Sequence, residues 1–429
     1  TGYRAPFQDM LLFPRPSVYD TIRPMRFQDS PVQPDRSSSR ITEVDALRGF
    51  ALFGLFVVHM VEYFELFWYA PEWGPVHDAV FFTFGGKAYA IFALLFGFSF
   101  SLMMGRQARR GVDFRGRFAW RLALLLAMGY LHGLLYSGDI LQVLALTGLL
   151  LIALYPLGNR GLLMVAALGL LQVPKLVQLG LAMVGDSGIS GPQHSGLMAE
   201  TFAIYAHGSF AEVVQRNVWA GQLGKWLFML ESGRLWNVIG MFCVGVVLER
   251  SRFFETFRQR IGRAVIAGLA LVALLPVVGM AARTVDAAGL PEDVAGLAHG
   301  ILEQYGNNLL TGLWVLLFLA ACHLPVLRIV TGWLAAPGRM SLTIYVSQSL
   351  YGVPLFYGFG LGLYTGFGQR NALALGLILW GGQMVFAAWW LRRYHYGPFE
   401  WLWRSATWLS SGVPFKRHDR QADAARNLA

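Results

Sequence analysis

Apolar runs of about twenty residues, each long enough to cross the roughly 30 Å hydrocarbon core of a bilayer as a helix, recur along this chain. Hydrophobic residues make up 55% of its 429 residues and charged residues only 14%, a balance that excludes a water-soluble globular protein. The sequence therefore predicts an all-α polytopic membrane protein with about ten transmembrane helices. These spans are expected near residues 44–67, 80–104, 118–137, 140–157, 161–184, 226–249, 263–283, 303–323, 339–361 and 371–391.

Basic residues are concentrated on one predicted side of the membrane. Most of the 35 Lys and Arg precede the first span, lie in the turns that follow the even-numbered spans, or follow the last span. Loops rich in Lys and Arg stay in the cytoplasm, so both ends of the chain are predicted to be cytoplasmic. The formal net charge of +10 therefore indicates topology and contact with membrane lipids rather than binding to nucleic acid.

Segments outside the spans have compositions of their own. Residues 1–39 are rich in Pro, Ser, Arg and Asp and are predicted to be a disordered cytoplasmic tail. Residues 185–225 mix apolar and charged side chains, which predicts one or two amphipathic helices on the outer face. Residues 397–411 carry three Trp and predict an interfacial helix on the cytoplasmic side, before a flexible tail at 412–429. The part between, 40–411, is expected to form a single transmembrane helical domain.

The first predicted span carries ionisable side chains into the membrane. On a helix, Arg48 and His59 would lie about 16 Å apart along the axis and about 20° apart in azimuth, and Asp45 and Glu62 fall near the same line. Such groups are costly in hydrocarbon, so this stripe is expected to face protein, water or ligand.

The stripe has a functional interpretation and a structural one. Arg48 could hold a phosphate bidentately, and His59 could meet the far end of an elongated ligand of the length of a pantetheine arm and act as a general base. In the alternative, Arg48 reaches toward lipid headgroups, Asp45 pairs with it, and His59 satisfies a neighbouring polar group.

A second constellation lies in the short outer turn between the third and fourth spans. His132 precedes Asp139 by one to two helical turns, and Gln142 follows Asp139 by three residues. A carboxylate beside a histidine can orient the imidazole and raise its basicity. The alternative is that Asp139 only caps the fourth span. We interpret His132 as a site residue because capping leaves the histidine without a role.

Other polar side chains in the spans are weaker candidates. Lys87 is a lone ammonium in the second span and needs a partner such as Asp139 or Glu62. Arg339 opens the ninth span, whose hydroxyl and amide side chains, including Gln348, indicate a helix that lines a cavity. Motifs for a phosphate-binding loop, a zinc protease and a nucleophile elbow are missing from the sequence, so no metal is expected.

Five stretches, in order along the chain, carry a family resemblance: residues 40–54, 86–97, 132–141, 338–349 and 392–404. They resemble the YeiB-like proteins, a bacterial family with a C-terminal domain of unknown function, and the likeness extends from about residue 40 to residue 408. The resemblance implies a location in the bacterial inner membrane. It also implies kinship with the transmembrane acyltransferases that include heparan-glucosaminide acetyltransferase, which move an acyl group from cytosolic coenzyme A to an acceptor on the far side.

One position departs from the YeiB-like pattern. His59 stands where those proteins usually have Asn, and the spacing of Arg48, ten residues and then His59 is similar to the signature of a sister acyltransferase group. The resemblance therefore favours acyl transfer and leaves open which histidine is catalytic.

These features together lead to the hypothesis of an acyltransferase with acyl-CoA as its co-substrate. Acyl-CoA would enter from the cytoplasm with its phosphates near Arg48 and near Arg121 or Arg339. His132 or His59 would then deprotonate the acceptor, an envelope glycan or lipid.

Two other functions stay open at this point. One is transport, with which part of the resembled family has been associated. In a transporter the translocation path would be lined by Lys87, Asp139, Glu231 and Arg234, and histidines would relay protons. In this sequence Glu231 and Arg234 are also spaced to satisfy each other. A non-catalytic scaffold would use the outer segment 185–225 and the Trp-rich C-terminal region for partner contacts.

Overall fold

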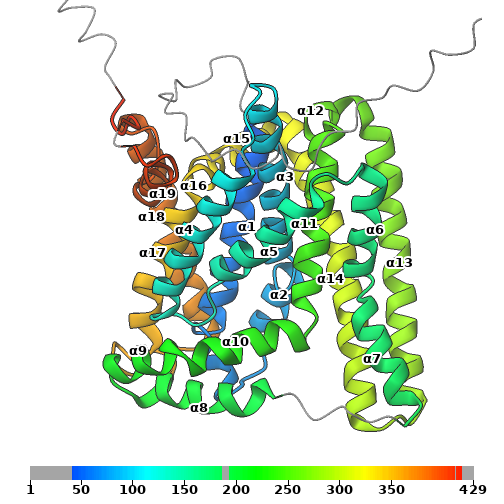
Figure 1. Ribbon diagram of the computed structural model, residues 1–429. Helices are drawn as coiled ribbons and strands as arrows, with labels where there is room; N and C mark the ends of the chain where they lie inside the picture. The colour runs from blue at the N-terminus through cyan, green and yellow to red at the C-terminus, as the bar shows by residue number, and fades with distance from the viewer. Residues whose placement is uncertain (1–40, 186–192, 411, 418–429) are drawn as a thin grey trace, which may run out of the picture. The chain divides into compact units, whose positions relative to one another are not determined.

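The computed structural model describes residues 41–185, 193–410 and 412–417, which belong to a unit built from α-helices (Figure 1). Within these residues no strand is found, so the all-α prediction is confirmed for them. The predicted tail at 1–39, residues 418–429 of the predicted tail at 412–429, and residues 186–192 of the predicted outer segment lie outside the described residues.

Each predicted span coincides with a helix or with a pair of helices. The helices concerned are α1 (Thr42–Val61), α3 (Ala88–Ala108), α4 (Arg115–Gly133), α5 (Leu141–Leu154), α6 (Asn159–Leu170) with α7 (Val173–Met183), α10 (Ala220–Glu231) with α11 (Arg234–Arg250), α13 (Ile261–Ala287), α14 (Glu292–His323), α17 (Ser341–Phe356) and α18 (Gln369–Arg393). By length and composition, 5 helical stretches of the described chain can cross a membrane, or 7 if each of two bent pairs forms one span. The larger span count and the topology stay predictions.

Shorter helices connect and flank these elements. They are α2 (Pro75–Thr83), α8 (His194–His207), α9 (Phe210–Val218), α12 (Phe253–Thr256), α15 (Pro325–Trp333), α16 (Ala335–Arg339) and α19 (Pro398–Trp408), with 3-10 turns η1 (Leu66–Trp68) and η2 (Arg258–Arg260). The segment predicted to hold one or two amphipathic helices contains α8, α9 and the start of α10. The predicted C-terminal interfacial helix coincides with α19.

Three spans that were predicted as continuous helices are interrupted. The chain adopts a left-handed conformation at Gly86 between α2 and α3, at Gln172 between α6 and α7, and at Gly233 between α10 and α11. A left-handed residue ends the i→i−4 hydrogen-bond ladder, so each helix stops there. The axis bends by 44° between α6 and α7 and by 68° between α10 and α11. Apolar periodicity runs through these points and therefore gives no sign of the breaks.

Helix α1 is an interior helix. It packs against α2, α3 and α14 to α18. In the most apolar segment of the stretch Thr42–Trp68, 72% of the residues are buried. In the stretch that contains α13 the corresponding share is 0%, and α13 packs chiefly against α14 (Figure 1). The polar stripe of α1 therefore faces other helices, as predicted.

A ridge of small residues brings α3 against α11. A Cβ atom added to Gly97 would overlap the backbone of Phe242 on α11. One turn further along α3, the Ser101 hydroxyl donates a hydrogen bond of 2.7 Å to the Glu249 carboxylate. The close approach of these two helices thus requires glycine at position 97.

Candidate functional site

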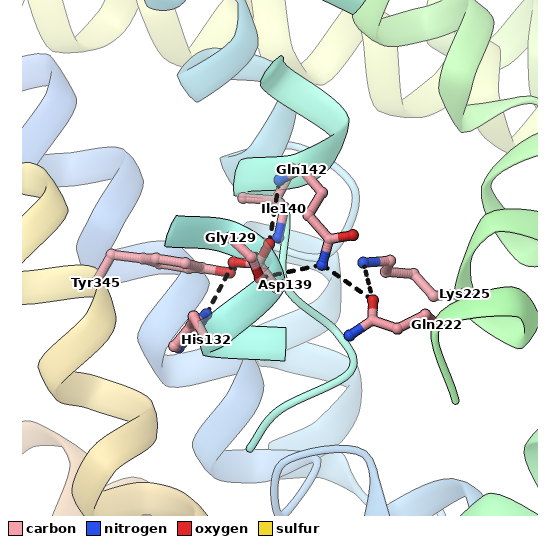
Figure 2. A network of polar contacts seen from close by, with 8 residues as sticks. All are labelled: Gly129, His132, Asp139, Ile140, Gln142, Gln222, Lys225 and Tyr345. Atoms are coloured by element: carbon pink, nitrogen blue, oxygen red, sulfur yellow. Dashed lines mark hydrogen bonds and ion pairs between the residues drawn. The ribbon is translucent and has the colours of Figure 1, made fainter. Parts of the chain in front are cut away.

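The side chains of His132 and Asp139 form a buried pair. His132 lies in the last turn of α4, and Asp139 lies in the turn before α5 (Figure 2). The Nδ1 atom of His132 is 2.8 Å from the Oδ1 atom of Asp139, and the two side chains are 3% and 0% exposed. Since Asp139 accepts the Nδ1–H group, the Nε2 atom of a neutral His132 carries the lone pair. That Nε2 atom is buried and has no hydrogen-bond partner among the described residues.

Asp139 also caps the first turn of α5. Its Oδ2 atom accepts a hydrogen bond of 3.1 Å from the backbone N–H group of Gln142. The two interpretations of Asp139, as a helix cap and as the partner of His132, are therefore both present in the structure. One carboxylate fixes the imidazole to the end of a helix, which limits how far the ring can rotate.

A chain of hydrogen bonds connects this pair to α10. The Gln142 side-chain amide donates to the Gly129 carbonyl oxygen at 3.0 Å and to the Gln222 Oε1 atom at 2.9 Å (Figure 2). The Lys225 ammonium donates to the same Gln222 oxygen at 2.8 Å. Gln222 and Lys225 belong to α10 and are buried. The position of α10 is thus coupled to the turn that carries Asp139.

Tyr345 of α17 supports the turn from the other side (Figure 2). Its hydroxyl accepts a hydrogen bond of 3.1 Å from the backbone N–H group of Ile140, and its ring centroid is 5.4 Å from that of His132. The imidazole therefore has its aspartate partner and an aromatic ring from a different helix as close neighbours.

His59 belongs to the same cluster through Tyr136. The Tyr136 hydroxyl donates to the Glu65 carboxylate at 3.0 Å and lies 2.9 Å from the Nδ1 atom of His59. A hydroxyl has one proton to donate, so His59 donates its Nδ1–H group to Tyr136. The Tyr136 ring centroid is 5.3 Å from that of His59 and 6.3 Å from that of His132. The structure thus brings the two predicted histidines to one place.

The turn that supplies Glu65 is strained. Tyr63, Phe64 and Glu65 have φ values of 52°, 52° and 81°, a left-handed conformation that costs roughly 1–3 kcal/mol for each non-glycine residue. The Phe64 ring is buried and fills a notch at Gly352, where a Cβ atom would overlap it. Tyr357 donates a hydrogen bond of 3.2 Å to the Phe64 carbonyl oxygen. Packing and hydrogen bonding therefore hold a conformation that the backbone alone disfavours.

Arg48 lies on α1, eleven residues before His59. Its guanidinium forms an ion pair of 3.3 Å with Asp45 and donates a hydrogen bond of 2.8 Å to the Ser99 hydroxyl. The side chain is 19% exposed, so Arg48 contacts neighbouring helices as well as solvent-accessible space. The predicted pairing of Asp45 with Arg48 is present.

Three other predicted site residues are described by the helices that they join or belong to. The Arg121 guanidinium lies over the Trp403 ring, 3.4 Å from its centroid, and thereby joins α4 to α19. The Gln348 side chain donates to the Gln383 side chain at 3.1 Å, which joins α17 to α18. Arg339 is the half-buried last residue of α16, a helix that packs on α1.

Two predicted pairings of charged residues do not occur. The Lys87 ammonium donates to the backbone carbonyl oxygen of Phe81 at 2.9 Å instead of to Asp139 or Glu62, because the end of α2 leaves carbonyl groups without helical partners.

Likewise, Glu231 forms an ion pair with His194. Arg234 lies over the rings of Tyr89 and Phe228. The break between α10 and α11 separates Glu231 from Arg234, so the helical spacing that suggested their pairing does not apply.

Several cluster residues were not among the predicted site residues. Tyr136 follows His132 by four residues, and this spacing is a signal that sequence analysis can use. Glu65, Gln222 and Lys225 reach the cluster through a strained turn and a broken helix, and no local pattern indicates either. Within the described part of the chain, no group of three or more His, Cys, Asp or Glu side chains is arranged to hold a metal ion.

The described residues also contain a surface hollow away from this cluster. It has a volume of about 570 Å³ and is lined by His323, Pro325, Arg328, Ile329, Gly332 and Trp333, beside α15. Its lining includes none of the predicted site residues, and we assign it no role.

Family models match two regions of the chain. Residues 40–184 match the family model described as heparan-alpha-glucosaminide N-acetyltransferase, catalytic, and residues 248–410 match the model described as protein of unknown function, DUF418. Both histidines, Asp139 and Arg48 lie in the first of these regions. The two histidines and Asp139 therefore lie in a region that is similar to this acetyltransferase family.

Curated relatives cover most of the chain. Uncharacterized protein YxaH of Bacillus subtilis is 28% identical over 412 residues, which is 89% of this chain and 97% of the relative. Uncharacterized protein YeiB of Escherichia coli is 29% identical over 359 residues, which is 78% of this chain and 85% of the relative. The resemblance to YeiB-like proteins is thus confirmed. Together with the apolar helices it indicates a membrane protein, whereas the inner membrane stays a prediction.

Proposed function

We propose that this chain is a membrane acyltransferase that moves an acyl group from acyl-CoA to a hydroxyl or amine acceptor. The observation that carries the proposal is the buried His132–Asp139 pair. The His132 Nε2 atom has no hydrogen-bond partner in the described part of the chain, which is the arrangement of a general base. This pair lies in the region that is similar to an N-acetyltransferase family.

The donor would lie along α1. Arg48 and His59 share one face of this helix, about 16 Å apart along the axis, and a guanidinium is suited to hold phosphate bidentately. We place the phosphates of acyl-CoA near Arg48, with Arg339 on the neighbouring α16, and the thioester near His59. The pantetheine arm would span the distance between them. Arg121 is a weaker candidate because it stacks on Trp403.

The acceptor would approach the two histidines from the predicted outer side. His132 Nε2 takes the proton of the attacking hydroxyl or amine as the new bond to the acyl carbon forms. The bond from the acyl carbon to sulfur then breaks, and coenzyme A leaves as a thiolate that takes up one proton to become the thiol. Asp139 orients the imidazole and balances its positive charge, and a base placed in this way typically contributes about 10²–10⁴-fold to a rate. An envelope glycan or lipid is the acceptor class that we propose.

Transfer of label from acyl-CoA tests the proposal. The purified protein is incubated with labelled acetyl-CoA and extracted envelope glycans or lipids, and we expect label in the acceptor fraction. His132→Gln should abolish the transfer. His299→Gln is the matched control, because His299 is a 40% exposed histidine that pairs with Asp286 between α13 and α14. Failure of the wild-type protein to bind coenzyme A would contradict the proposal.

Transport is a second candidate, and the three interrupted helices favour it. Transporter sites are commonly built where spans break near the middle of the membrane. Against it, Lys87, Asp139, Glu231 and Arg234 each bind a different partner instead of following one path. Proton-coupled uptake into vesicles that is lost in Asp139→Asn would favour transport over acyl transfer.

A further inference from the structure

We infer that His59, Tyr136 and Glu65 form a second proton-transfer unit of the site, which delivers a proton to the departing sulfur atom of coenzyme A. His132 takes the proton of the acceptor, so the two histidines have opposite tasks. The inference rests on the proposed acyl transfer and extends it to the fate of the leaving group.

The hydrogen bonds of this unit have one direction. Tyr136 donates to Glu65, and His59 donates its Nδ1–H group to Tyr136. The described residues offer no hydrogen bond to the opposite ring nitrogen, Nε2, and the side chain is 14% exposed. When His59 is an imidazolium, Nε2–H is therefore the proton that it can transfer. His59 shares its helix face with Arg48, which places it beside the thioester end of the proposed donor.

The leaving group needs such a proton. A thiol ionises near pH 8.5 in water, and a thiolate released among buried side chains would lack the solvent that stabilises its charge. Transfer from His59 to sulfur produces the neutral thiol as the carbon–sulfur bond breaks. Afterwards the His132 imidazolium releases its proton and His59 takes one up, so the number of protons is balanced over the cycle.

Two carboxyl groups lie close to the unit, one beside His59 and one beside Tyr136. The Glu62 carboxylate lies 3.9 Å from Nδ1 of His59 and is itself held by the Trp68 indole N–H group at 2.9 Å. Glu65 reaches Tyr136 only because three successive residues, beginning at Tyr63, are left-handed. Strain of this kind persists where the surrounding structure fixes it and is concentrated at functional sites. The turn thus brings a carboxylate to the tyrosine that a relaxed helix end would not.

Replacing the sulfur atom of the acyl donor distinguishes proton delivery to the leaving group from a merely structural role of the unit. Acetyl-coenzyme A is compared with its selenium analogue, in which selenium replaces the sulfur atom. A selenol is a stronger acid than a thiol, so the selenolate leaves without needing a proton. In Tyr136→Phe and Glu65→Gln we expect the rate with the thioester to fall at least about tenfold, and the rate with the selenoester to fall less than about twofold. In His132→Gln both rates should fall together.

Equal losses with both donors in Tyr136→Phe and Glu65→Gln would overturn the inference. A measurement on the wild-type protein covers the case in which both variants misfold. The solvent deuterium isotope effect should be larger with the thioester than with the selenoester, and equal isotope effects would also overturn it. Transfer that fails with both donors in the wild-type protein would instead contradict the proposed function.

Discussion

The Nδ1 atom of His132 lies 2.8 Å from the Oδ1 atom of Asp139, and the other oxygen of the same carboxylate caps α5. The position of the imidazole is therefore set by the end of a helix and does not depend on a flexible loop. A site that must hold a base within a few tenths of an ångström of its target gains from such an anchor. The same arrangement allows the capping role of Asp139 to be separated from its electrostatic role.

Asp139→Asn and Asp139→Ala should differ in stability but not in activity. Asn keeps an oxygen that can accept from the Gln142 N–H group, whereas Ala removes the cap at a cost of about 1 kcal/mol. Both variants lose the negative charge that balances the His132 imidazolium, so we expect acyl transfer to fall at least about 100-fold in each. Thermal unfolding in detergent and transfer assays measure the two effects. Full activity in Asp139→Asn would contradict the role of the carboxylate.

Arg48→Gln should weaken the binding of coenzyme A. Hydrogen bonds to a charged group contribute about 1.5–3 kcal/mol, so we expect the Kd to rise roughly 10-fold to 100-fold. Arg121→Gln is the control, because loss of its stacking on Trp403 should lower stability by about 0.5–2 kcal/mol without a change in Kd. Titration calorimetry with coenzyme A distinguishes the two, and the opposite pattern would show that Arg121 holds the phosphates.

Position 65 should prefer glycine to alanine. Glu65 has a φ of 81°, a conformation that costs an L-residue about 1–2 kcal/mol and costs glycine almost nothing. We expect Glu65→Gly to be about 1 kcal/mol more stable than Glu65→Ala, although glycine is normally the less stabilising residue. Both variants should transfer acyl groups slowly, because Tyr136 loses its acceptor. Unfolding curves that rank alanine above glycine would show that the turn relaxes.

The apolar pattern of the sequence predicts where most of the long helices lie. A helix that crosses a bilayer needs about twenty mostly apolar residues, and the average hydropathy of such a segment follows directly from the sequence. An average over twenty residues cannot detect a single left-handed residue such as Gln172 or Gly233, because one residue hardly changes the average hydropathy. The predicted continuous fifth and sixth spans are therefore each bent pairs of helices.

The candidate site shows the same division between local and distant features. His132 and Asp139 are seven residues apart in one turn, and their pairing could be predicted from that spacing. The Tyr136 bridge between His59 and His132 depends on how α1 packs beside the turn after α4, which no local pattern encodes. The hydrogen bond of Lys87 to a backbone carbonyl could not be predicted for a similar reason, because the apolar pattern does not indicate the break after α2.

Two glycine substitutions should separate helix packing from helix propensity. In Gly97→Ala the added Cβ atom meets the Phe242 backbone, and backbone cannot move aside as the end of a side chain can. We expect α3 and α11 to be pushed apart at a cost of about 1–3 kcal/mol. In Gly279→Ala on α13 nothing lies within 4 Å of the added atom, so the gain in helix propensity should stabilise the protein by about 0.5–1 kcal/mol. The free energy of unfolding in detergent measures both, and a stable Gly97→Ala would contradict the close contact between these two helices.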